Sequence, residues 1–243
     1  MNEGYVTFVN NNKNYVELTN ILIESVLLFS TRPIEVFSIN FDYIHSSPKV
    51  LSKRINLPEE TFETICYSKL YSSFNSSFDN GIQLDSDFII TKNMDLLFED
   101  CKKITQTPLG SLHPSDPNNQ SEVMNFLGVK EKTQPYVHAT YLFSNNCKPF
   151  LEECYLLSKE FMSKNINPQN FDETILNVML WKYNANNFVT TYDPYYDFFI
   201  NRSEENKILH GYGNIPVNFY SCHGEKNPEL AKIILKNLIN SNL

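Results

Sequence analysis

Two aspartates near the middle of the chain are the side chains best suited to bind a metal ion. Asp85 and Asp87 are separated by one serine and directly follow the short apolar run Gly81–Leu84. A rigid strand that ends in two carboxylates offers the oxygen ligands that a hard divalent cation needs. In open α/β sheets, ligands bind beyond the carboxyl ends of the strands, where this pair is expected to lie. We therefore predict a divalent metal site here; the alternative is an acidic turn that only ends a strand.

A histidine and a lysine late in the sequence extend this prediction. His223 follows the β-rich run Val217–Ser221, so it is also expected at a strand end. An imidazole beside two carboxylates favours Mn²⁺ over Mg²⁺, whose sites are usually built from oxygen alone. Lys226 could place a positive charge on a phosphate. A structural histidine and a solvent-exposed lysine are the alternatives for these two residues.

A second acidic pair, Asp172 and Glu173, opens a run with the apolar spacing of a helix. One of the two carboxylates is a candidate for assisting a reaction. Carboxylates in the first turn of a helix also interact favourably with its dipole, so a purely structural role accounts for them equally well. The histidines without the spacing of a metal site are His45, His113, His138 and His210.

The elements that must position these residues alternate between strands and helices. A β-rich run at Tyr5–Asn10, a helical pattern at Tyr15–Phe29 and a second β-run at Ile34–Ile39 form a βαβ unit, which predicts a parallel sheet. Further strands are expected at 81–84, 109–112, 136–144, 188–191 and 217–221, and further helices at 59–74, 149–164, 172–181 and 228–239. The fold class is therefore predicted as α/β.

The chain shows no internal repeat and no change in composition that would mark a linker. Its 243 residues fit one large domain. The segment Ser111–Thr133 is rich in proline, asparagine, serine and charge, which predicts a long loop.

Charge and cysteine usage exclude some classes of function. The 28 acidic and 20 basic residues give a net charge of -8, opposite to the pattern of a nucleic-acid-binding protein. The five cysteines form no C-x-x-C pair, so we expect reduced thiols and no zinc site. The N-terminal residues show no signal peptide, and no run is apolar enough for a membrane span. We expect a soluble, cytoplasmic protein.

Three motifs along the chain resemble those of one enzyme family. They are YVTFVNNNKNYVELTNILIESVLL (5–28), YSKLYSSF…DNGIQLDSDFIITKNMDLLF (67–98) and the tetrapeptide His223-Gly224-Glu225-Lys226. Together they resemble glycosyltransferase family 8, a group of nucleotide-sugar glycosyltransferases with the GT-A fold. The resemblance implies a single Rossmann-like domain with a mixed, mostly parallel sheet flanked by helices. Its nucleotide-binding half would span about 1–100 and its acceptor-side half about 101–243.

The resemblance also implies roles for individual residues. Tyr15 matches an aromatic residue that stacks on uracil, Lys69 falls near a basic residue close to the diphosphate, and Lys226 matches a lysine on the distal phosphate. The residues assigned to nucleotide binding are Val9, Asn10, Tyr15, Lys69, Asp85, Ser86, Gly224 and Lys226. The implied metal ligands are Asp85, Asp87 and His223, and the implied catalytic residues are Asp172 and Glu173. One departure from the family is the segment Tyr136–Thr140, which has His and Thr where the family usually has Asn and Gly.

The implied activity is Mn²⁺-dependent (or Mg²⁺-dependent) transfer of a sugar from a UDP-sugar, with retention, to a glycan, protein or small-molecule acceptor. One alternative is a sugar-1-phosphate nucleotidyltransferase, but the loop at Asn10–Asn12 lacks the glycines that such enzymes use to hold phosphate. A second alternative is a non-catalytic binding protein with a transferase-like fold. The acceptor and the oligomeric state, a homodimer included, stay open.

Overall fold

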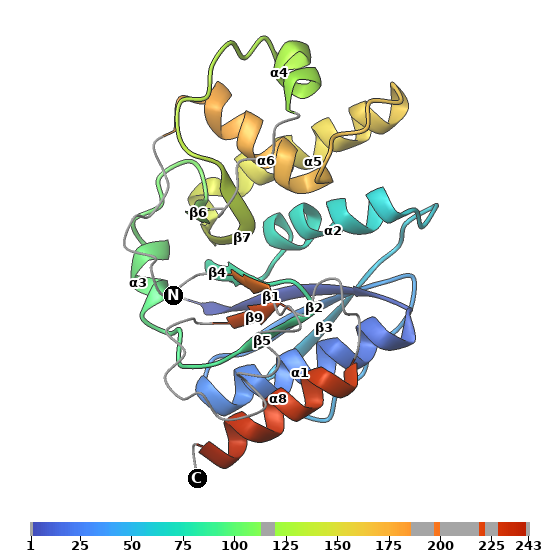
Figure 1. Cartoon of the computed structure of the whole chain (residues 1–243), viewed down its shortest axis with the longest axis vertical. Coiled ribbons are helices and arrows are strands. Elements are labelled where there is room, and N and C mark those ends of the chain that lie inside the picture. Colours follow the sequence, from blue (N-terminus) through green and yellow to red (C-terminus); the bar gives the residue numbers. More distant parts are fainter. Residues whose placement is uncertain (1, 113–119, 186–196, 200–218, 222–227, 242–243) are drawn as a thin grey trace. The chain divides into compact units, whose positions relative to one another are not determined.

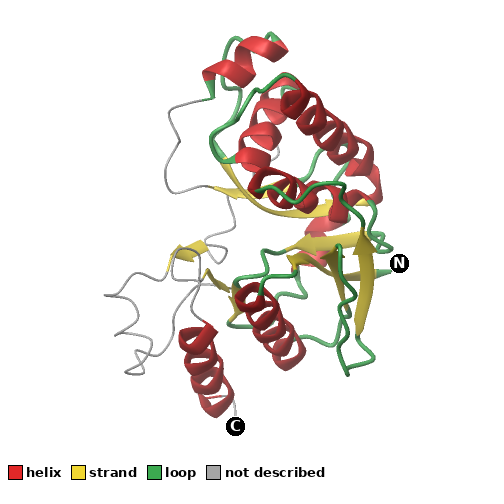
Figure 2. Ribbon diagram, turned by 90° about the vertical axis from the view of Figure 1, so that its right-hand side faces the viewer, coloured by secondary structure: helices red, strands yellow, loops and turns green. Residues whose placement is uncertain are grey.

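The computed structural model describes residues 2–112, 120–185, 197–199, 219–221 and 228–241. It is an α/β structure with a mixed six-stranded sheet flanked by helices (Figures 1 and 2). The predicted fold class is confirmed at this level.

The strands are β1 (Glu3–Asn10), β2 (Ile34–Ile39), β3 (Val50–Ile55), β4 (Asn80–Gln83), β5 (Phe88–Ile90), β6 (Leu109–Leu112), β7 (Val137–Ser144), β8 (Asp197–Phe199) and β9 (Phe219–Ser221). The helices are α1 (Lys13–Phe29), α2 (Phe62–Phe74), α3 (Leu97–Cys101), α4 (Ser121–Leu127), α5 (Lys148–Ser163), α6 (Phe171–Lys182) and α8 (Pro228–Ser241), with a 3₁₀ turn η1 at Asn145–Cys147.

The six-stranded sheet has the order β3-β2-β1-β4-β7-β6. Strand β1 pairs with β4 in parallel, as β2 does with β3, whereas β7 pairs antiparallel with both β4 and β6. A second sheet of three short strands has the order β5-β9-β8. Parallel neighbours such as β1 and β4 have their carboxyl ends at the same edge, where β1 ends at Asn10 and β4 is followed by Leu84 and Asp85.

The predicted elements agree with the structure most closely in the first forty residues. Strand β2 occupies the predicted range, and α1 begins two residues before the predicted Tyr15. The helix starts earlier because the side chain of Asn12 accepts a hydrogen bond from the backbone N–H of Asn14 at 2.9 Å, which caps the first turn. The predicted strand at 188–191 and the first two residues of the one at 217–221 lie outside the described residues.

The prediction of a continuous loop at Ser111–Thr133 is wrong for its middle part. Helix α4 lies within this segment and buries Val123. It ends at Gly128, whose φ of 68° is a left-handed conformation that closes the last turn and that glycine adopts without steric cost. The loop prediction rests on composition, and a helix this short, with one buried residue, shows no apolar periodicity that would reveal it in the sequence.

Two compact units, each built from several stretches of the chain, make up the structure. The first comprises Met1–Val6, Leu57–Gln83 and Leu97–Thr190. In this unit α2, α5 and α6 pack against one another, and α6 also packs on β7 (Figure 1). A Cβ atom added at Gly81 would lie 2.1 Å from the ring of Phe143 on the neighbouring strand, so glycine allows this close packing.

The second unit comprises Thr7–Asn56, Leu84–Leu96 and Thr191–Leu243. Helix α1 packs against both β5 and α8. The buried residues of this core are Leu18, Ile21, Ile89, Ala231, Ile234 and Leu235. These contacts hold α1, which follows β1 in the chain, against β5 and α8. The single-domain prediction, with halves that divide near residue 100, stays a prediction.

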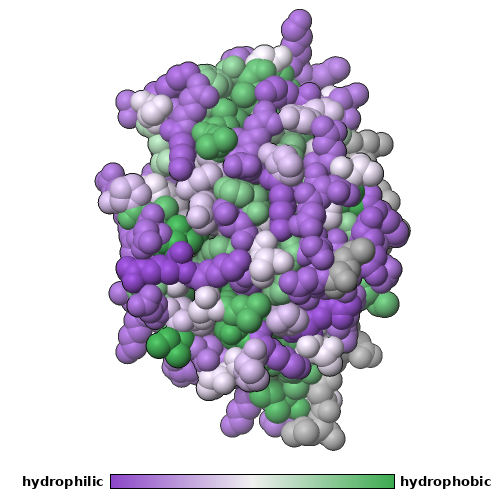
Figure 3. Space-filling model, turned by 180° about the vertical axis from the view of Figure 1, so that it is seen from behind, coloured by the Kyte–Doolittle hydropathy of each residue, from purple (hydrophilic) through white to green (hydrophobic). Residues whose placement is uncertain are grey.

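Some large apolar side chains of the described residues are exposed. Ile44 and Leu96 are the most exposed of them, at 88% and 84%. Hydrophilic residues predominate on the face in Figure 3, with small hydrophobic patches between them. In the part of the chain that the structure describes, no helix has both the length and the hydropathy to cross a membrane.

Candidate functional site

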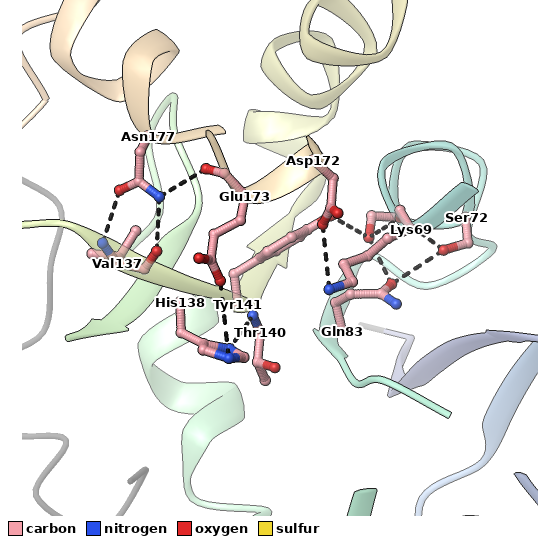
Figure 4. A network of polar contacts seen from close by, with 11 residues as sticks. Lys69, Ser72, Gln83, Val137, His138, Thr140, Tyr141, Asp172, Glu173 and Asn177 are labelled. Carbon is pink, nitrogen blue, oxygen red and sulfur yellow. Dashed lines mark hydrogen bonds and ion pairs between the residues drawn. The ribbon is translucent and has the colours of Figure 1, made fainter. Parts of the chain in front are cut away.

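Four ionisable side chains come together in the first unit, and we call them the charged cluster: Lys69, His138, Asp172 and Glu173. They come from α2, β7 and the first turn of α6 (Figure 4). Each of these residues is at most 9% exposed. Burial of several ionisable groups is costly unless they compensate one another, which makes this cluster a candidate for function.

The first turn of α6 brings the two carboxylates into the interior. Asn170 and Phe171 have φ values of 60° and 41°, so the chain turns sharply before the helix begins. The hydroxyl of Thr174 donates to the carbonyl of Gln169 at 2.7 Å and supports this turn. All residues from Asp172 to Trp181 are buried, so the acidic pair does not lie on a solvated helix face. The predicted helix at 172–181 is confirmed within one residue at each end.

Lys69 and Asp172 form a buried ion pair. The ammonium nitrogen lies 3.3 Å from Oδ2 of Asp172, and both side chains are below 10% exposed. The carboxylate also helps to raise the pKa values of Tyr67 and Tyr141, although burial of the phenol is the larger cause for both. Opposite charges at this distance compensate each other's loss of hydration, so Lys69 neutralises Asp172.

A separate set of hydrogen bonds joins α2 and β7 to strand β4. The Tyr141 hydroxyl lies 2.9 Å from the Ser73 hydroxyl, which donates to Oε1 of Gln83 at 2.8 Å. Ser72 donates to the same oxygen at 3.2 Å. Gln83 is the last residue of β4, so α2, β7 and the end of β4 are linked through buried polar groups.

His138 lies beside Glu173. Nε2 of His138 is 3.9 Å from Oε2 of Glu173, while its Nδ1 accepts a hydrogen bond from the backbone N–H of Thr140 at 3.1 Å. The phenol of Tyr136 hydrogen-bonds to Glu173, and burial followed by the nearby carboxylate raises the pKa of Tyr136. An imidazole from β7 and the phenol of the residue before β7 therefore lie beside the Glu173 carboxylate.

Asn177 fixes the register between α6 and β7. Its side chain accepts from the N–H of Val137 and donates to the carbonyl of the same residue, both at 2.8 Å. It also donates to the backbone carbonyl of Glu173 at 2.8 Å. One buried amide thus holds the start of β7 against the turn that carries Glu173 (Figure 4).

The second unit contains the predicted residues that follow β1 and β4. Val9 and Asn10 end β1, and Asp85 follows β4 after one intervening residue. Because β1 and β4 are parallel, Asn10 and Asp85 leave the sheet at the same edge. Ser86 and Asp87 are 7% and 6% exposed. Strand β4 ends one residue earlier than the predicted run 81–84, and the role of the aspartate pair as a metal site stays a prediction.

Tyr15 is partly buried and packs against the apolar core that α1 shares with α8 and β5. This contact alone accounts for an aromatic residue at the start of α1. Its predicted stacking on a base stays a prediction.

Part of the predicted site falls outside the described residues: His223, Gly224 and Lys226. Among the residues that the structure describes, no group of three His, Cys, Asp or Glu side chains is arranged to hold a metal ion. This finding does not test the predicted set of Asp85, Asp87 and His223, because it does not cover His223. The predicted catalytic residues Asp172 and Glu173 are both in the charged cluster, and so is the predicted nucleotide-binding residue Lys69.

His138 and Tyr136 are the residues that sequence reasoning missed. His138 was judged only by the spacing of a metal site, and a single histidine that faces a carboxylate leaves no such spacing. The available signal was the departure from the family pattern in Tyr136–Thr140, together with strand alternation, which places His138 and Thr140 on one face of β7.

No protein-family model matches the chain, and no curated protein matches its sequence.

Proposed function

We propose that the protein is a metal-dependent glycosyltransferase that moves a sugar from a UDP-sugar to a glycan, protein or small-molecule acceptor with retention of configuration. The observation that carries this proposal is the sheet edge at which the parallel strands β1 and β4 end: β1 ends at Asn10, and the Asp85–Asp87 pair follows β4 after one residue. This edge is where α/β sheets bind nucleotides and other ligands.

In this proposal the residues of the second unit bind the donor. Asp85, Asp87 and His223 would hold Mn²⁺, since two carboxylates and an imidazole are a donor set that this ion accepts. The bound ion would neutralise negative charge that develops on the diphosphate leaving group. Val9, Asn10, Ser86 and Gly224 would line the nucleotide, and Tyr15 would orient the base.

The lysines and the second acidic pair act on the reacting end of the donor. Lys226 would contact the distal phosphate, and Lys69 would add positive charge near the diphosphate. Transfer breaks the bond from the anomeric carbon to the diphosphate oxygen and forms a bond to the acceptor oxygen, whose proton passes to the departing diphosphate. A carboxylate of the pair Asp172 and Glu173 would stabilise the positive charge that the sugar gains as the first bond breaks.

Release of UDP from a panel of UDP-sugars in the presence of Mn²⁺ tests the proposal. We expect slow hydrolysis of at least one UDP-sugar by the wild-type protein. The double variant Asp85→Ala/Asp87→Ala should lower this rate by at least about 100-fold, because a catalytic metal contributes several kcal/mol to transition-state stabilisation. The matched control is Glu59→Ala/Glu60→Ala, which removes two exposed carboxylates and should keep the wild-type rate.

The same assay separates the competing functions. A nucleotidyltransferase would instead release pyrophosphate from UTP when given a sugar 1-phosphate. If the wild-type protein releases UDP from none of the sugars, or if both double variants are equally active, the glycosyltransferase proposal is wrong.

A further inference from the structure

The loop that follows β2 in the second unit is held in place at both of its ends. Asn40 has a φ of 60°, which turns the chain directly after the strand, and its N–H donates to the carbonyl of the last residue of β3 at 2.8 Å. The Ser38 hydroxyl donates to the carbonyl of Phe41 at 2.7 Å. Tyr43 is buried, and its phenol donates a hydrogen bond to the side chain of Asn20 on α1. The residues on either side of position 42 therefore have fixed positions.

Arg54, the next-to-last residue of β3, binds this loop through its guanidinium group. Nη2 donates to the carbonyl of Asn40 and Nη1 donates to Oδ1 of Asp42, both at 3.1 Å. Nε donates to Oδ1 of Asn56 at 2.9 Å. A planar guanidinium that makes several such bonds orients its partners in a way that a lysine cannot. Asp42 is thus oriented by Arg54, while its side chain is 76% exposed and so remains accessible to a ligand.

Asp42 follows β2 after two residues, at the same sheet edge as the proposed donor site. Strands β2 and β1 are neighbours in the sheet, and α1 carries the chain back between them, so both end at this edge. Strand β4 flanks β1 on the other side and is followed by Asp85. Asn10, Asp42 and Asp85 all belong to the second unit.

The order of the strands determines which part of a nucleotide lies near Asp42. Neighbouring strands are about 4.8 Å apart, so the chain leaves β2 and β4 at points about 10 Å from each other. An extended nucleoside diphosphate covers this distance across the end of β1. With its diphosphate at the metal site that includes Asp85, its nucleoside lies on the side of β2.

The chemistry of a carboxylate also favours the nucleoside over the phosphates. An ionised carboxylate accepts hydrogen bonds and donates none, so it repels phosphate oxygens and attracts hydroxyl groups. In dinucleotide-binding α/β folds, an acidic residue early in the chain binds the ribose 2′-hydroxyl in this way. The ion pair with Arg54 reduces the negative charge that Asp42 would otherwise place near a diphosphate.

We propose that Asp42 accepts a hydrogen bond from the ribose 2′-hydroxyl of the donor nucleotide and that Arg54 is the positioning residue that aims it. This inference rests on the proposed function and adds to it the residue that recognises the ribose. The protein then distinguishes ribonucleotides from deoxyribonucleotides, because 2′-deoxy-UDP offers no hydroxyl to the oriented carboxylate.

Calorimetric titrations of UDP and of 2′-deoxy-UDP in the presence of Mn²⁺ test the contact. We expect the wild-type protein to bind UDP at least about 10-fold more tightly than 2′-deoxy-UDP, because a hydrogen bond to a charged group is lost with the hydroxyl. Asp42→Ala should reduce this preference to about threefold or less, since protein and nucleotide then lack the two halves of one contact. The matched control Glu160→Ala removes another half-exposed carboxylate that pairs with a cation, and it should keep the wild-type preference.

The same titrations test the positioning role of Arg54. Arg54→Met should lose most of the preference for UDP while its urea unfolding midpoint stays close to that of the wild type, because exposed ion pairs contribute little to stability. Arg54→Lys restores the charge but not the planar group, so it should recover only part of the preference. Lys164→Met, which breaks the exposed pair with Glu160, is the control and should bind both nucleotides like the wild type.

The outcomes separate this inference from the proposed function. Equal affinity of the wild-type protein for the two nucleotides, or a preference that survives Asp42→Ala, refutes the role of Asp42 and leaves the glycosyltransferase proposal standing. A full preference in Arg54→Met or in Arg54→Lys refutes the positioning role of Arg54. If the wild-type protein binds neither nucleotide in the presence of Mn²⁺, the proposed function is wrong and the inference fails with it.

Discussion

At the level of single residues, the first unit buries two opposite charges that compensate each other. Lys69 and Asp172 are charged residues in the interior, where apolar residues are usual, and both side chains are below 10% exposed. A buried pair of this kind contributes little compared with an apolar pair, but the loss of one partner leaves a buried charge. The ion pair therefore allows a prediction about stability that is independent of the proposed sugar transfer.

Replacing Lys69 alone should strongly destabilise the protein. We expect Lys69→Met to lower the free energy of unfolding by about 3–5 kcal/mol, because Asp172 is then buried without its cation. The double variant Lys69→Met/Asp172→Leu should recover most of this loss. Urea denaturation followed by circular dichroism measures both changes.

The control for this prediction is Lys164→Met, which breaks an ion pair with Glu160 whose two side chains are 49% and 47% exposed. Lys164→Met should lower the free energy of unfolding by less than about 1 kcal/mol, as for other surface ion pairs. Equal losses of stability for Lys69→Met and Lys164→Met would mean that burial does not increase the cost of breaking the Lys69 ion pair.

The sequence indicated individual site residues but not their partners. Asp172 and Glu173 could be identified because a helix start has a recognisable pattern, and Asp85 because it follows an apolar run. That Lys69 pairs with Asp172 depends on how α2 packs against α6, and these residues are far apart in the chain. His138 faces Glu173 only because Asn177 holds β7 and α6 in register.

Among the elements, strand β4 shows how closely the sheet of the first unit is packed. Gly81 on β4 lies opposite Phe143 on β7, and an added Cβ would lie 2.1 Å from the ring. Phe143 is completely buried, so its ring cannot swing into solvent to make room. The side chain at this position is therefore limited to a hydrogen atom.

Substituting this glycine should reduce stability through overpacking. We expect Gly81→Ala to lower the free energy of unfolding by about 1–3 kcal/mol. The double variant Gly81→Ala/Phe143→Leu should lose less than the sum of the two single variants, because the smaller side chain leaves space for the methyl group. Thermal and urea denaturation measure the three changes. Strictly additive losses would contradict the contact.

Helices and strands whose own residues show a clear apolar or β-rich pattern could be predicted from the sequence. Strand β2 is rich in β-branched and aromatic residues, and α1 has apolar residues at helical spacing with an asparagine cap, so the sequence predicts both. Strand β3 was missed because most of its residues are exposed or partly exposed, and it forms through its pairing with β2. The short helix α4 was missed because one buried residue gives no periodicity.

For the molecule as a whole, buried thiols and phenols determine how stability depends on pH. Burial raises the pKa of Cys147 to about 12 and raises the pKa values of several other groups as well. These other groups are Cys101, Cys154, Tyr67, Tyr136 and Tyr141. In the unfolded chain, thiols titrate near about pH 8.5 and phenols near about pH 10.

The protein should therefore lose stability in alkaline solution. A group whose pKa is higher in the folded state contributes fully below its unfolded pKa, and this contribution disappears as the pH rises towards the folded value. We expect the free energy of unfolding to be level from about pH 6 to about pH 8 and to fall above about pH 9, first from the thiols and then from the phenols. Denaturation in reducing buffer across this range measures the decline, and Cys101→Ala should make it less steep. A constant or rising stability up to about pH 10 would refute this assignment.

The central claim for the whole protein is that it binds a uridine diphosphate through a divalent cation. Calorimetric titration of UDP into the protein, with and without Mn²⁺, tests this claim most directly. We predict binding that requires Mn²⁺, is lost in Asp85→Ala/Asp87→Ala and is retained in Glu59→Ala/Glu60→Ala. Binding that is independent of Mn²⁺, binding that survives loss of both aspartates, or no binding at all would contradict the account.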